Sequence, residues 1–242
     1  MAESRRVAIV TGASRGLGNV IARVLAVRGY DLVVGARDEE ALADAARSLR
    51  AVGPRVVTVP GDVAEPGVRA WLIDEARQLG DLYALVNNAS ELGGIRRIAD
   101  LEPDRLERVF QVNVAAPASL VRLAVPLLER TGGLIVNISS DAARGGYPGW
   151  GAYGASKAAL DLLTKTMDAE LRARGIAAVA VDPGDLRTRM HQEAFPGEDI
   201  SDRPDPDVTA PFWNWLFAQH PAAIAGERFV AQEEHARWLQ PV

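Results

Sequence analysis

Short apolar runs alternate with helix-length segments along this chain, and this pattern limits the possible folds more strongly than any other. Each run is too short for a buried helix and is rich in valine, isoleucine and leucine, which indicates a buried β-strand. The segments between the runs have apolar residues at helical spacing, as at Leu17, Ile21 and Leu25. Seven strands are predicted, at residues 7–10, 31–35, 56–59, 83–86, 134–138, 176–181 and 228–230.

This alternation implies strands joined by helical crossovers, and therefore a mostly parallel sheet with helices on both faces. The expected fold class is a doubly wound α/β sheet of seven strands, which binds ligands at the carboxyl ends of its strands. The chain contains no internal repeat and no linker, so residues 1–242 are predicted to form a single domain. The stretch at about 190–211 has four prolines and six acidic residues, which predicts either a functional lid or a partly disordered loop.

Charge and composition exclude several classes of function. A formal net charge of −5, from 32 acidic and 27 basic residues, argues against a surface that binds nucleic acid. No disulfide or metal site is expected, because the chain has no cysteine and its histidines are far apart, at His191, His220 and His235. The apolar runs are far shorter than the ~20 residues that span a membrane, and the start lacks a signal-peptide pattern. We therefore expect a cytoplasmic protein with no membrane partner.

The first predicted strand runs into a glycine-rich turn, residues 11–18, with the sequence TGASRGLG. Glycines in such a turn let backbone N–H groups approach a pyrophosphate, which then lies at the positive end of the following helix. The alternative is an ordinary strand-to-helix turn. Because a strand precedes this turn and a helix follows it, in the first βα unit, the pattern favours dinucleotide binding.

Tyr153 and Lys157 form a second candidate motif, because residues four apart share one face of a helix. A phenol normally titrates near ~10, and a nearby cation can lower this pKa by ~1 to 3 units, toward the range useful for proton transfer. The alternative is a helix with a half-buried tyrosine and an exposed lysine. Composition weakens that alternative, since 25 of the 27 basic residues are arginine and Lys165 is the only other lysine. The pair therefore predicts an acid–base site.

Several segments at predicted strand ends follow one another in the order typical of a known family. They are the Gly-x-x-x-Gly-x-Gly turn, Asp62-Val63, residues 87–90 (NNAS) and residues 183–188 (PGDLRT). With the Tyr-x-x-x-Lys motif, they resemble the short-chain dehydrogenase/reductase family over the chain up to about Thr188. The resemblance implies a Rossmann-type fold and these cofactor-binding residues: Gly12, Ser14, Arg15, Gly16, Leu17, Gly18, Arg37, Asp62, Val63, Asn87, Ala89, Tyr153, Lys157, Pro183, Gly184 and Thr188.

The resemblance also implies roles for four catalytic positions, all of which are filled in this chain. Tyr153 is expected to be the general acid or base, and Lys157 its activator and a ligand of the cofactor ribose. Ser140, thirteen residues before the tyrosine, would donate a hydrogen bond to the substrate oxygen, whereas Ser139 is expected to be structural. The backbone of Asn113 would hold a water that relays protons to the lysine.

Three further positions bear on how the cofactor is held. In the family, the counterpart of Thr188 hydrogen-bonds the nicotinamide amide or the pyrophosphate, and that of Asn87 helps hold the cofactor near its ribose. Ser90 departs from the family, which usually has glycine there. It adds a side chain near the predicted cofactor site.

The end of the second predicted strand indicates which nicotinamide cofactor is used. In the family an acid at position 36 accompanies NAD, whereas this chain has Ala36 followed by Arg37. Arg37 and Arg15 resemble the NADP-preferring members, and a guanidinium can bind a phosphate through two donors at once. NADP(H) is therefore predicted. The less favoured alternative is NAD(H), with a solvated Arg37 and with Asp38 capping the next helix.

Residues near the predicted mouth of the site suggest what kind of substrate enters. One group suggests an apolar pocket: Tyr147, Trp150, Phe195 and Trp213. A second group disfavours a strongly anionic substrate: Asp141, Asp185 and the acidic stretch at 190–211. We expect a neutral, partly apolar carbonyl or alcohol compound as the small-molecule substrate.

The predicted helix of Tyr153 has a run of small residues, Gly154, Ala155, Ala158 and Ala159, which would let another helix approach closely. The family commonly pairs this helix across a subunit interface, so a homodimer or homotetramer is expected. Small residues packed within one subunit would give the same sequence pattern.

The motifs together predict an NADP(H)-dependent oxidoreductase that transfers a hydride between the nicotinamide and a carbonyl or alcohol. One alternative is a non-catalytic NADP-binding sensor or regulatory protein on the same fold, which would not need the four catalytic positions. Another is an epimerase or dehydratase of the wider family. Those chains are usually longer and carry a substantial substrate domain, for which this chain has little room.

Overall fold

The computed structural model describes residues 5–233 and contains one seven-stranded sheet, in which every neighbouring pair of strands is parallel. The predicted doubly wound fold is therefore confirmed, with each strand end within two residues of the predicted one. The strand order is β3-β2-β1-β4-β5-β6-β7. The strands are β1 (Arg6–Thr11), β2 (Asp31–Ala36), β3 (Val56–Pro60), β4 (Asp81–Asn87), β5 (Leu134–Ile138), β6 (Ala177–Asp182) and β7 (Arg228–Val230). The ends of the predicted 1–242 domain, with His235, lie outside the described residues.

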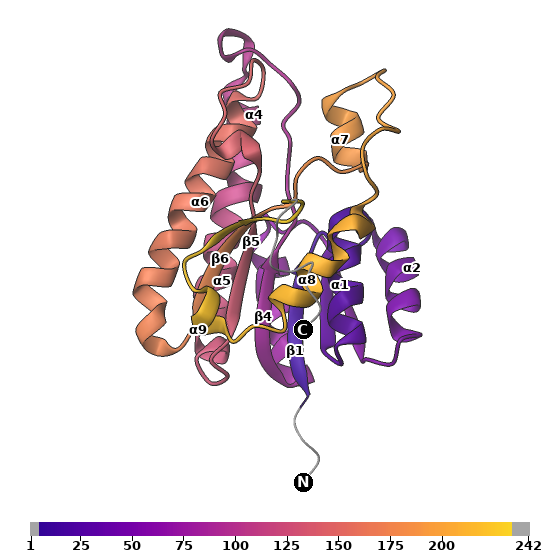
Figure 1. Cartoon of the computed structure of the whole chain (residues 1–242), viewed down its shortest axis with the longest axis vertical. Coiled ribbons are helices and arrows are strands. Elements are labelled where there is room, and N and C mark those ends of the chain that lie inside the picture. Colours follow the sequence, from indigo (N-terminus) through magenta and orange to yellow (C-terminus); the bar gives the residue numbers. More distant parts are fainter. Residues whose placement is uncertain (1–4, 234–242) are drawn as a thin grey trace.

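Helices cover both faces of the sheet. In Figure 1, α1, α2 and α8 lie on one side of it and α4, α5 and α6 on the other. The helices are α1 (Gly16–Val27), α2 (Glu39–Arg50), α3 (Pro66–Leu79), α4 (Pro103–Phe110), α5 (Ala116–Leu128), α6 (Gly151–Leu171), α7 (Arg189–Ala194), α8 (Ala210–Leu216) and α9 (Pro221–Ile224).

Side chains of one strand alternate between two hydrophobic cores, which explains why the strands are continuous apolar runs. In β1, Ala8 and Val10 pack in the core that contains α1, α2 and α8. Val7 and Ile9 of the same strand pack in the opposite core, with side chains of α3 and α5. Because both faces are buried, a polar residue inside a strand would need a partner in the sheet or a helix.

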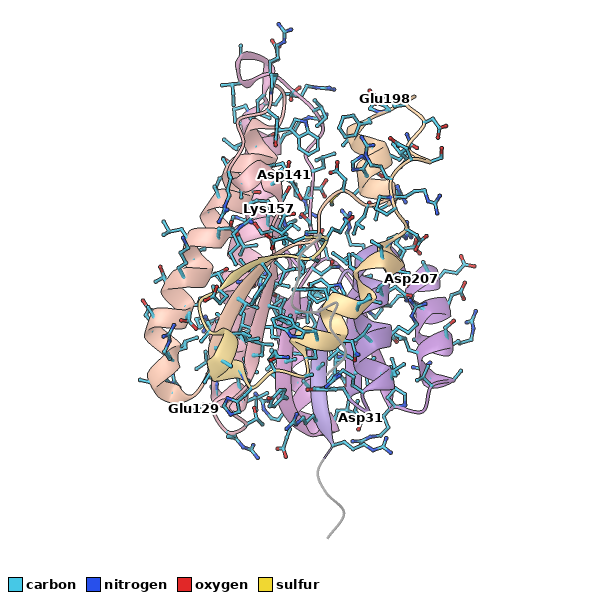
Figure 2. The ribbon with its side chains drawn as sticks, in the orientation of Figure 1. Asp31, Glu129, Asp141, Lys157, Glu198 and Asp207 are labelled. Atoms are coloured by element: carbon cyan, nitrogen blue, oxygen red, sulfur yellow. The ribbon has the colours of Figure 1, made fainter. Side chains whose placement is uncertain are left out.

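The order of the strands reverses between β1 and β4, and this reversal positions the functional site. From β1 the chain proceeds to β2 and β3 on one side, and then crosses back to β4 and the strands beyond it. In such sheets the crossover helices diverge at the reversal and leave a crevice at the carboxyl ends of the strands. Lys157 and Asp141 lie toward this end of the sheet, whereas Asp31 and Glu129 lie at the opposite end (Figure 2).

The longest apolar helical segment runs through α4, a π-helical turn (η2, Gln111–Ala115) and α5. This segment, Pro103–Leu128, is long and apolar enough to cross a membrane by length and composition, and half of its most apolar window is buried. Its α5 portion packs against β4 and α3, as expected of a helix that covers the central strands.

The proline-rich stretch at 190–211 contains more regular structure than an irregular loop would. It begins inside α7, and a 3₁₀ turn (η5, Pro206–Thr209) leads it into α8. Trp213, expected at the mouth of the site, is instead fully buried in the core beside α1, where its Nε1 donates to Thr209 Oγ1 at 2.9 Å. That expectation is wrong because α8 turns this side chain toward the sheet.

Candidate active site

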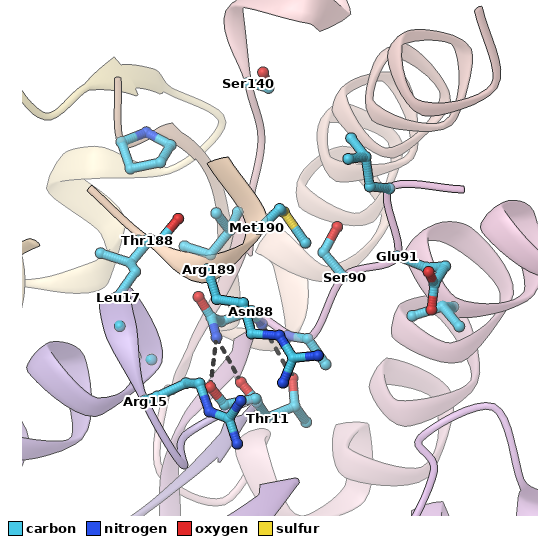
Figure 3. A pocket seen from close by; sticks show the side chains of 18 of the residues that line it. Thr11, Arg15, Leu17, Asn88, Ser90, Glu91, Ser140, Thr188, Arg189 and Met190 are labelled. Atoms are coloured by element: carbon cyan, nitrogen blue, oxygen red, sulfur yellow. Dashed lines mark hydrogen bonds between the residues drawn. The ribbon is translucent and has the colours of Figure 1, made fainter. Parts of the chain in front are cut away.

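A cavity of about 730 Å³ opens at the carboxyl ends of the strands. Its walls are the glycine-rich turn, the loop after β4, the end of β5, the start of α6 and the segment after β6 (Figure 3). Within residues 5–233, the lining includes every predicted site residue except Asn87 and Asn113. The structure therefore brings together residues that are up to 176 positions apart, from Gly12 to Thr188, in one cavity.

Close packing around the turn after β1 leaves no room for side chains at two of its glycines. A Cβ on Gly18 would lie 2.2 Å from Gly12 O, and one on Gly12 would lie 2.8 Å from Asn88 Nδ2. Gly12 and Gly16 also have φ values of +67° and +55°, which glycine adopts without strain. Asn88 Nδ2 donates to Thr11 O at 2.8 Å and to Gly12 O at 3.1 Å, so it holds the turn in place.

The turn leads directly into α1, whose first residue is Gly16. Arg15 is the N-cap residue, and its guanidinium, which has no acceptor atom, pairs with Asp38 and leaves the first helical N–H groups without a side-chain partner. Those groups lie at the positive end of a twelve-residue helix, a suitable site for a phosphate. The glycine cradle and this helix end therefore fit the pyrophosphate of a dinucleotide.

The structure places the two asparagines at the end of β4 differently from the prediction. Asn87 is buried in the sheet, where its Nδ2 donates to Asn137 Oδ1 at 2.8 Å, and Asn137 Nδ2 donates to Thr164 Oγ1 at 2.8 Å. Its side chain is therefore engaged inside the sheet and does not line the cavity, and its predicted contact with the cofactor stays a prediction. Asn88, one residue later and on the other side of the chain, lines the cavity instead.

Charged side chains gather where the cavity passes β2. Asp38 caps α2, because its Oδ1 accepts a hydrogen bond from the Ala41 N–H at 3.1 Å, as the alternative interpretation predicted. This hydrogen bond, and then the pairing with Arg15, lowers the pKa of Asp38. Arg37 Nη1 lies 3.2 Å from Glu91 Oε2 and keeps most of its surface exposed. Both arginines that were predicted to select NADP thus line the cavity.

Asp62, predicted to bind the cofactor, is fixed by two neighbours. Its Oδ1 accepts a hydrogen bond from the Ala64 N–H at 2.9 Å, and its other oxygen pairs with Arg108 of α4. Burial acts to raise the pKa of Asp62, but these two hydrogen bonds outweigh it and the pKa is lowered. Arg108 lines the cavity and was not predicted, because nothing in its helical position distinguishes it from a solvated arginine.

The predicted acid–base pair lies on α6, with both side chains buried and facing the cavity. Lys157 Nζ lies 5.5 Å from the centre of the Tyr153 ring. It donates a hydrogen bond to Ile138 O at 2.8 Å, which anchors the ammonium at the end of β5. The four-residue spacing therefore places the two groups together, as expected.

The direction of the Tyr153 pKa differs from the prediction. Burial raises the pKa of Tyr153 to about 12, although hydrogen bonding with Ser140 and Ser90 acts in the opposite direction. Burial also lowers the pKa of Lys157 to about 8, against the attraction of Asp161. The predicted lowering of the tyrosine pKa by the lysine is therefore wrong for this structure, because removal of the phenol from water dominates.

Two serines flank the tyrosine. Ser140 Oγ donates to Asp141 Oδ1 at 3.0 Å and accepts from the Ala142 N–H at 3.2 Å, so the hydroxyl is held at the cavity wall. Ser90, the departure from the family pattern, also lines the cavity, and its Oγ donates to Asn113 Oδ1 at 3.1 Å. The added side chain is thus integrated into the site.

Asn113 lies behind the cavity, in the π-helical turn η2. Its Oδ1 accepts a hydrogen bond from the Glu91 N–H at 2.8 Å, and its Nδ2 donates to Glu91 O at 2.9 Å and to Ser156 Oγ at 2.9 Å. The side chain therefore joins the loop after β4 to the helix of Tyr153. The predicted water relay through its backbone stays a prediction.

A buried arginine supports the site from β7. Arg228 Nε donates to Asp161 Oδ2 at 2.9 Å, and its Nη2 donates to Asp182 Oδ2 at 3.2 Å and to Ser140 O at 2.9 Å. These contacts tie the ends of β5, β6 and β7 to α6. Sequence reasoning missed this network, because its partners are between 46 and 88 residues from Arg228.

A reversed strand order with a glycine cradle at the reversal defines a dinucleotide-binding α/β protein, here with a buried tyrosine and lysine at its cavity. The family model for short chain dehydrogenase matches residues 6–199. The chain therefore belongs to the short-chain dehydrogenase/reductase family of oxidoreductases.

Three similar proteins illustrate this relationship. A short-chain type dehydrogenase/reductase from Picea abies is 37% identical over 195 residues, covering 76% of this chain and 72% of its own. An NADPH-dependent aldehyde reductase-like protein from Arabidopsis thaliana is 34% identical, covering 76% of this chain and 74% of its own. The crystal structure of a short chain dehydrogenase from Shigella flexneri, complexed with NADP, superposes with a TM-score of 0.88 at 29% identity, covering 94% and 97% of the two chains.

Proposed function

We propose that this protein is an NADP(H)-dependent oxidoreductase that interconverts a carbonyl and an alcohol, with Tyr153 as the general acid or base. The observation that carries the proposal is the buried pair of Tyr153 and Lys157 in a cavity that begins at a dinucleotide-type glycine turn. A bound nicotinamide would supply or accept the hydride at this end of the cavity.

The chain's own residues supply the proton and stabilise the charge. With a pKa of about 12, Tyr153 is protonated at neutral pH and can give its proton to the carbonyl oxygen as negative charge develops there. Lys157, with a pKa of about 8, is mostly charged at pH 7, so its ammonium can stabilise the phenolate that remains. Ser140 lies at the cavity wall, and its hydroxyl hydrogen would turn from Asp141 to donate a hydrogen bond to the same substrate oxygen.

The preference for NADP(H) rests on the arginines near β2. Arg15, Arg37 and Arg189 line the cavity, and Arg15 and Arg189 both act electrostatically on Asp38. A 2′-phosphate would meet several guanidinium groups there, whereas the hydroxyl of NAD would gain little from them. The Arabidopsis protein is an NADPH-dependent aldehyde reductase-like protein and the Shigella structure contains NADP, and both support the same choice.

The test is a panel of aldehydes, ketones and alcohols assayed with NADPH and NADH in parallel, on the wild type and on Tyr153→Phe. We expect turnover with NADPH in the wild type and a loss of about 10²- to 10⁴-fold in kcat in the variant, with NADPH binding retained. A variant that binds NADPH and keeps its turnover would overturn the role of Tyr153. Binding of NADPH without turnover of any compound would favour the non-catalytic sensor.

A further inference from the structure

Arg228 of β7 carries a positive charge that is almost completely removed from water, with 9% of its side chain exposed. Its guanidinium lies between the carboxylates of Asp161 on α6 and Asp182 at the end of β6, whose side chains are 14% and 8% exposed. Buried ion pairs add little stability compared with well-packed apolar side chains of similar volume. Stability alone therefore does not explain a cation at this place behind the cavity.

Two buried cations hold the backbone that follows β5. Arg228 Nη2 donates to Ser140 O at 2.9 Å, and Lys157 Nζ donates to Ile138 O at 2.8 Å. The two carbonyl groups are two residues apart in one short segment, so each cation fixes one end of it. The hydroxyl of Ser140, which lies at the cavity wall, is thereby placed from behind by Arg228.

The same guanidinium reaches a second wall of the cavity through Asp182. Asp182 Oδ2 accepts a hydrogen bond from Arg228 Nη2 at 3.2 Å, and its Oδ1 accepts one from the Gly184 N–H at 3.0 Å. Gly184 lies in the cavity-lining segment after β6 that is predicted to bind the cofactor. Arg228 therefore connects the segments after β5 and β6, although it does not line the cavity itself.

The two carboxylates beside Arg228 also act on the acid–base pair. Asp161 follows Lys157 by one helical turn, and its attraction acts to raise the pKa of Lys157. Asp182 acts to raise the pKa of Tyr153. Arg228 is the only hydrogen-bond partner of the Asp161 carboxylate within residues 5–233. Without the guanidinium, both negative charges would act on the pair with less compensation.

One further carboxylate acts on the pair from the segment after β5. Asp141 also acts to raise the pKa of Tyr153, and its oxygens accept hydrogen bonds from Ser140 Oγ at 3.0 Å and Tyr147 OH at 2.8 Å. These two partners are uncharged and do not compensate the charge of Asp141. The balance of charge behind the pair therefore depends strongly on Arg228.

We propose that Arg228 is a positioning residue for the proposed reaction, because its guanidinium holds the backbone of Ser140 and compensates the carboxylates behind Tyr153 and Lys157. It acts through these neighbours rather than on the reacting atoms. The inference rests on the proposed function for the reaction itself, but the effect of Arg228 on Lys157 is measurable without turnover.

NMR of protein labelled with ¹³Cε-lysine tests that effect directly, because Lys165 is the only other lysine and its exposed side chain is an internal reference. In the wild type, the Lys157 signal should titrate with its midpoint near pH 8. Arg228→Gln can still donate to Ser140 O but has no charge, and its midpoint should rise to about pH 9 or above. Arg228→Lys keeps the cation and should keep the midpoint to within about 0.3 pH units.

Two further variants separate charge from general loosening of the structure. Arg228→Gln combined with Asp161→Asn removes one negative charge together with the cation, and should return the midpoint toward pH 8. Arg172→Gln is the matched control, because Arg172 pairs with the buried Asp168 on the same helix and does not line the cavity. An unchanged midpoint in Arg228→Gln, or an equal rise in Arg172→Gln, overturns the inference.

Asp161→Asn alone carries the test if Arg228→Gln does not fold. Removing this carboxylate while Arg228 remains should lower the midpoint of Lys157 below pH 8, because the attraction that favours the charged ammonium is lost. A midpoint that stays the same or rises in this variant overturns the inference.

Kinetics then connect Arg228 to the reaction, with a carbonyl compound that the wild type reduces with NADPH. In the wild type, kcat should fall above about pH 8, where Lys157 loses its charge. In Arg228→Gln we expect kcat at pH 7 to fall about tenfold and its decline at alkaline pH to move upward with the Lys157 midpoint. A lower kcat with an unmoved pH profile would show a merely structural role and overturn the inference. If no carbonyl compound is reduced, the proposed function fails, and the NMR midpoints still decide whether Arg228 acts on Lys157.

Discussion

Burial acts on Tyr153 and Lys157 so that each side chain resists becoming charged. The pKa of Lys157 falls from its usual 10.5 to about 8, and that of Tyr153 rises from its usual 10.0 to about 12. Between about pH 8 and 10.5 the unfolded chain binds a proton at Lys157 that the folded chain has released, so the free energy of unfolding rises with pH. Between about pH 10 and 12 the folded chain retains the Tyr153 proton that the unfolded chain loses, so the free energy of unfolding falls.

This opposition predicts that replacing Lys157 changes the dependence of stability on pH. In the wild type, Lys157 contributes about 3 kcal/mol to the rise in the free energy of unfolding between pH 8 and 10.5. This contribution should disappear in Lys157→Met. Lys165→Met is the matched control, because Lys165 is an exposed lysine on the same helix. Urea unfolding at a series of pH values measures the effect. Parallel pH profiles for the two variants would contradict it.

A second prediction at the residue scale concerns the choice of cofactor. Arg37 is 63% exposed and makes one ion pair, with Glu91, so its guanidinium can turn to a phosphate at little cost. In Arg37→Gln we expect KM for NADPH to rise about tenfold or more, because a charge-assisted hydrogen bond is lost, and KM for NADH to change less than twofold. Arg47→Gln, on the exposed face of α2, serves as the control. A uniform change for both cofactors would refute a phosphate contact.

At the scale of single elements, the turn before α1 depends on close backbone packing. Alanine at position 18 would place its Cβ 2.2 Å from Gly12 O and 2.4 Å from Asn88 Nδ2. We expect Gly18→Ala to destabilise the protein by about 1 to 3 kcal/mol and to weaken NADPH binding, since the turn must open to accept the methyl group.

Gly67→Ala provides the contrast, because this glycine lies in the first turn of α3 with nothing within 4 Å of the added Cβ. It should stabilise the protein by about 0.5 to 1 kcal/mol. Thermal unfolding of both variants, with a fluorescence titration of NADPH, would measure these effects. Gly18→Ala with wild-type stability and affinity would show that the turn tolerates a side chain.

The elements were predictable from sequence wherever burial is periodic. The inner strands of the sheet are buried on both faces, so each reads as an apolar run, whereas the edge strands β3 and β7 are only partly buried. Helices such as α1 show their buried side at regular spacing. Asn87 shows the limit of that approach. A shift of one residue along a strand turns a side chain from the sheet interior to the cavity, and only the pairing with Asn137 determines which of the two asparagines is inside.

The same limit applies to residues that act through partners distant in sequence. Local motifs revealed Tyr153, Lys157 and the glycine turn, because their spacing along the chain sets their geometry. Arg228 and Arg108 gave no local signal, since their roles depend on Asp182 and Asp62, which other elements bring near. The pKa of Tyr153 was wrongly predicted for a related reason. The extent of its burial depends on how α6, α7 and the loop after β4 pack together.

At the scale of the whole molecule, the exposed side of α6 bears on how the protein assembles, whereas its buried side is explained by packing within one subunit. Gly154 is explained within one subunit, because a Cβ there would lie 2.7 Å from Ala142 O. Ala155, Ala158 and Leu162 are exposed at helical spacing and form a narrow apolar stripe, with Leu162 68% exposed. Such a stripe suits close contact with the same helix of a second copy.

This stripe predicts that the protein assembles through α6 and that a charge at its centre prevents assembly. By light scattering after size exclusion, the wild type should have two or four times the chain mass of 25.9 kDa, and Leu162→Arg should shift to one or two times that mass. Val27→Arg is the matched control, because Val27 is 70% exposed but lies at the end of α1 in the opposite helical layer.

If Val27→Arg dissociates the assembly and Leu162→Arg does not, the interface lies on the α1 side. If the wild type itself has the mass of a single chain, the stripe on α6 is a feature of the monomer surface, and the small residues of this helix serve only packing within the subunit.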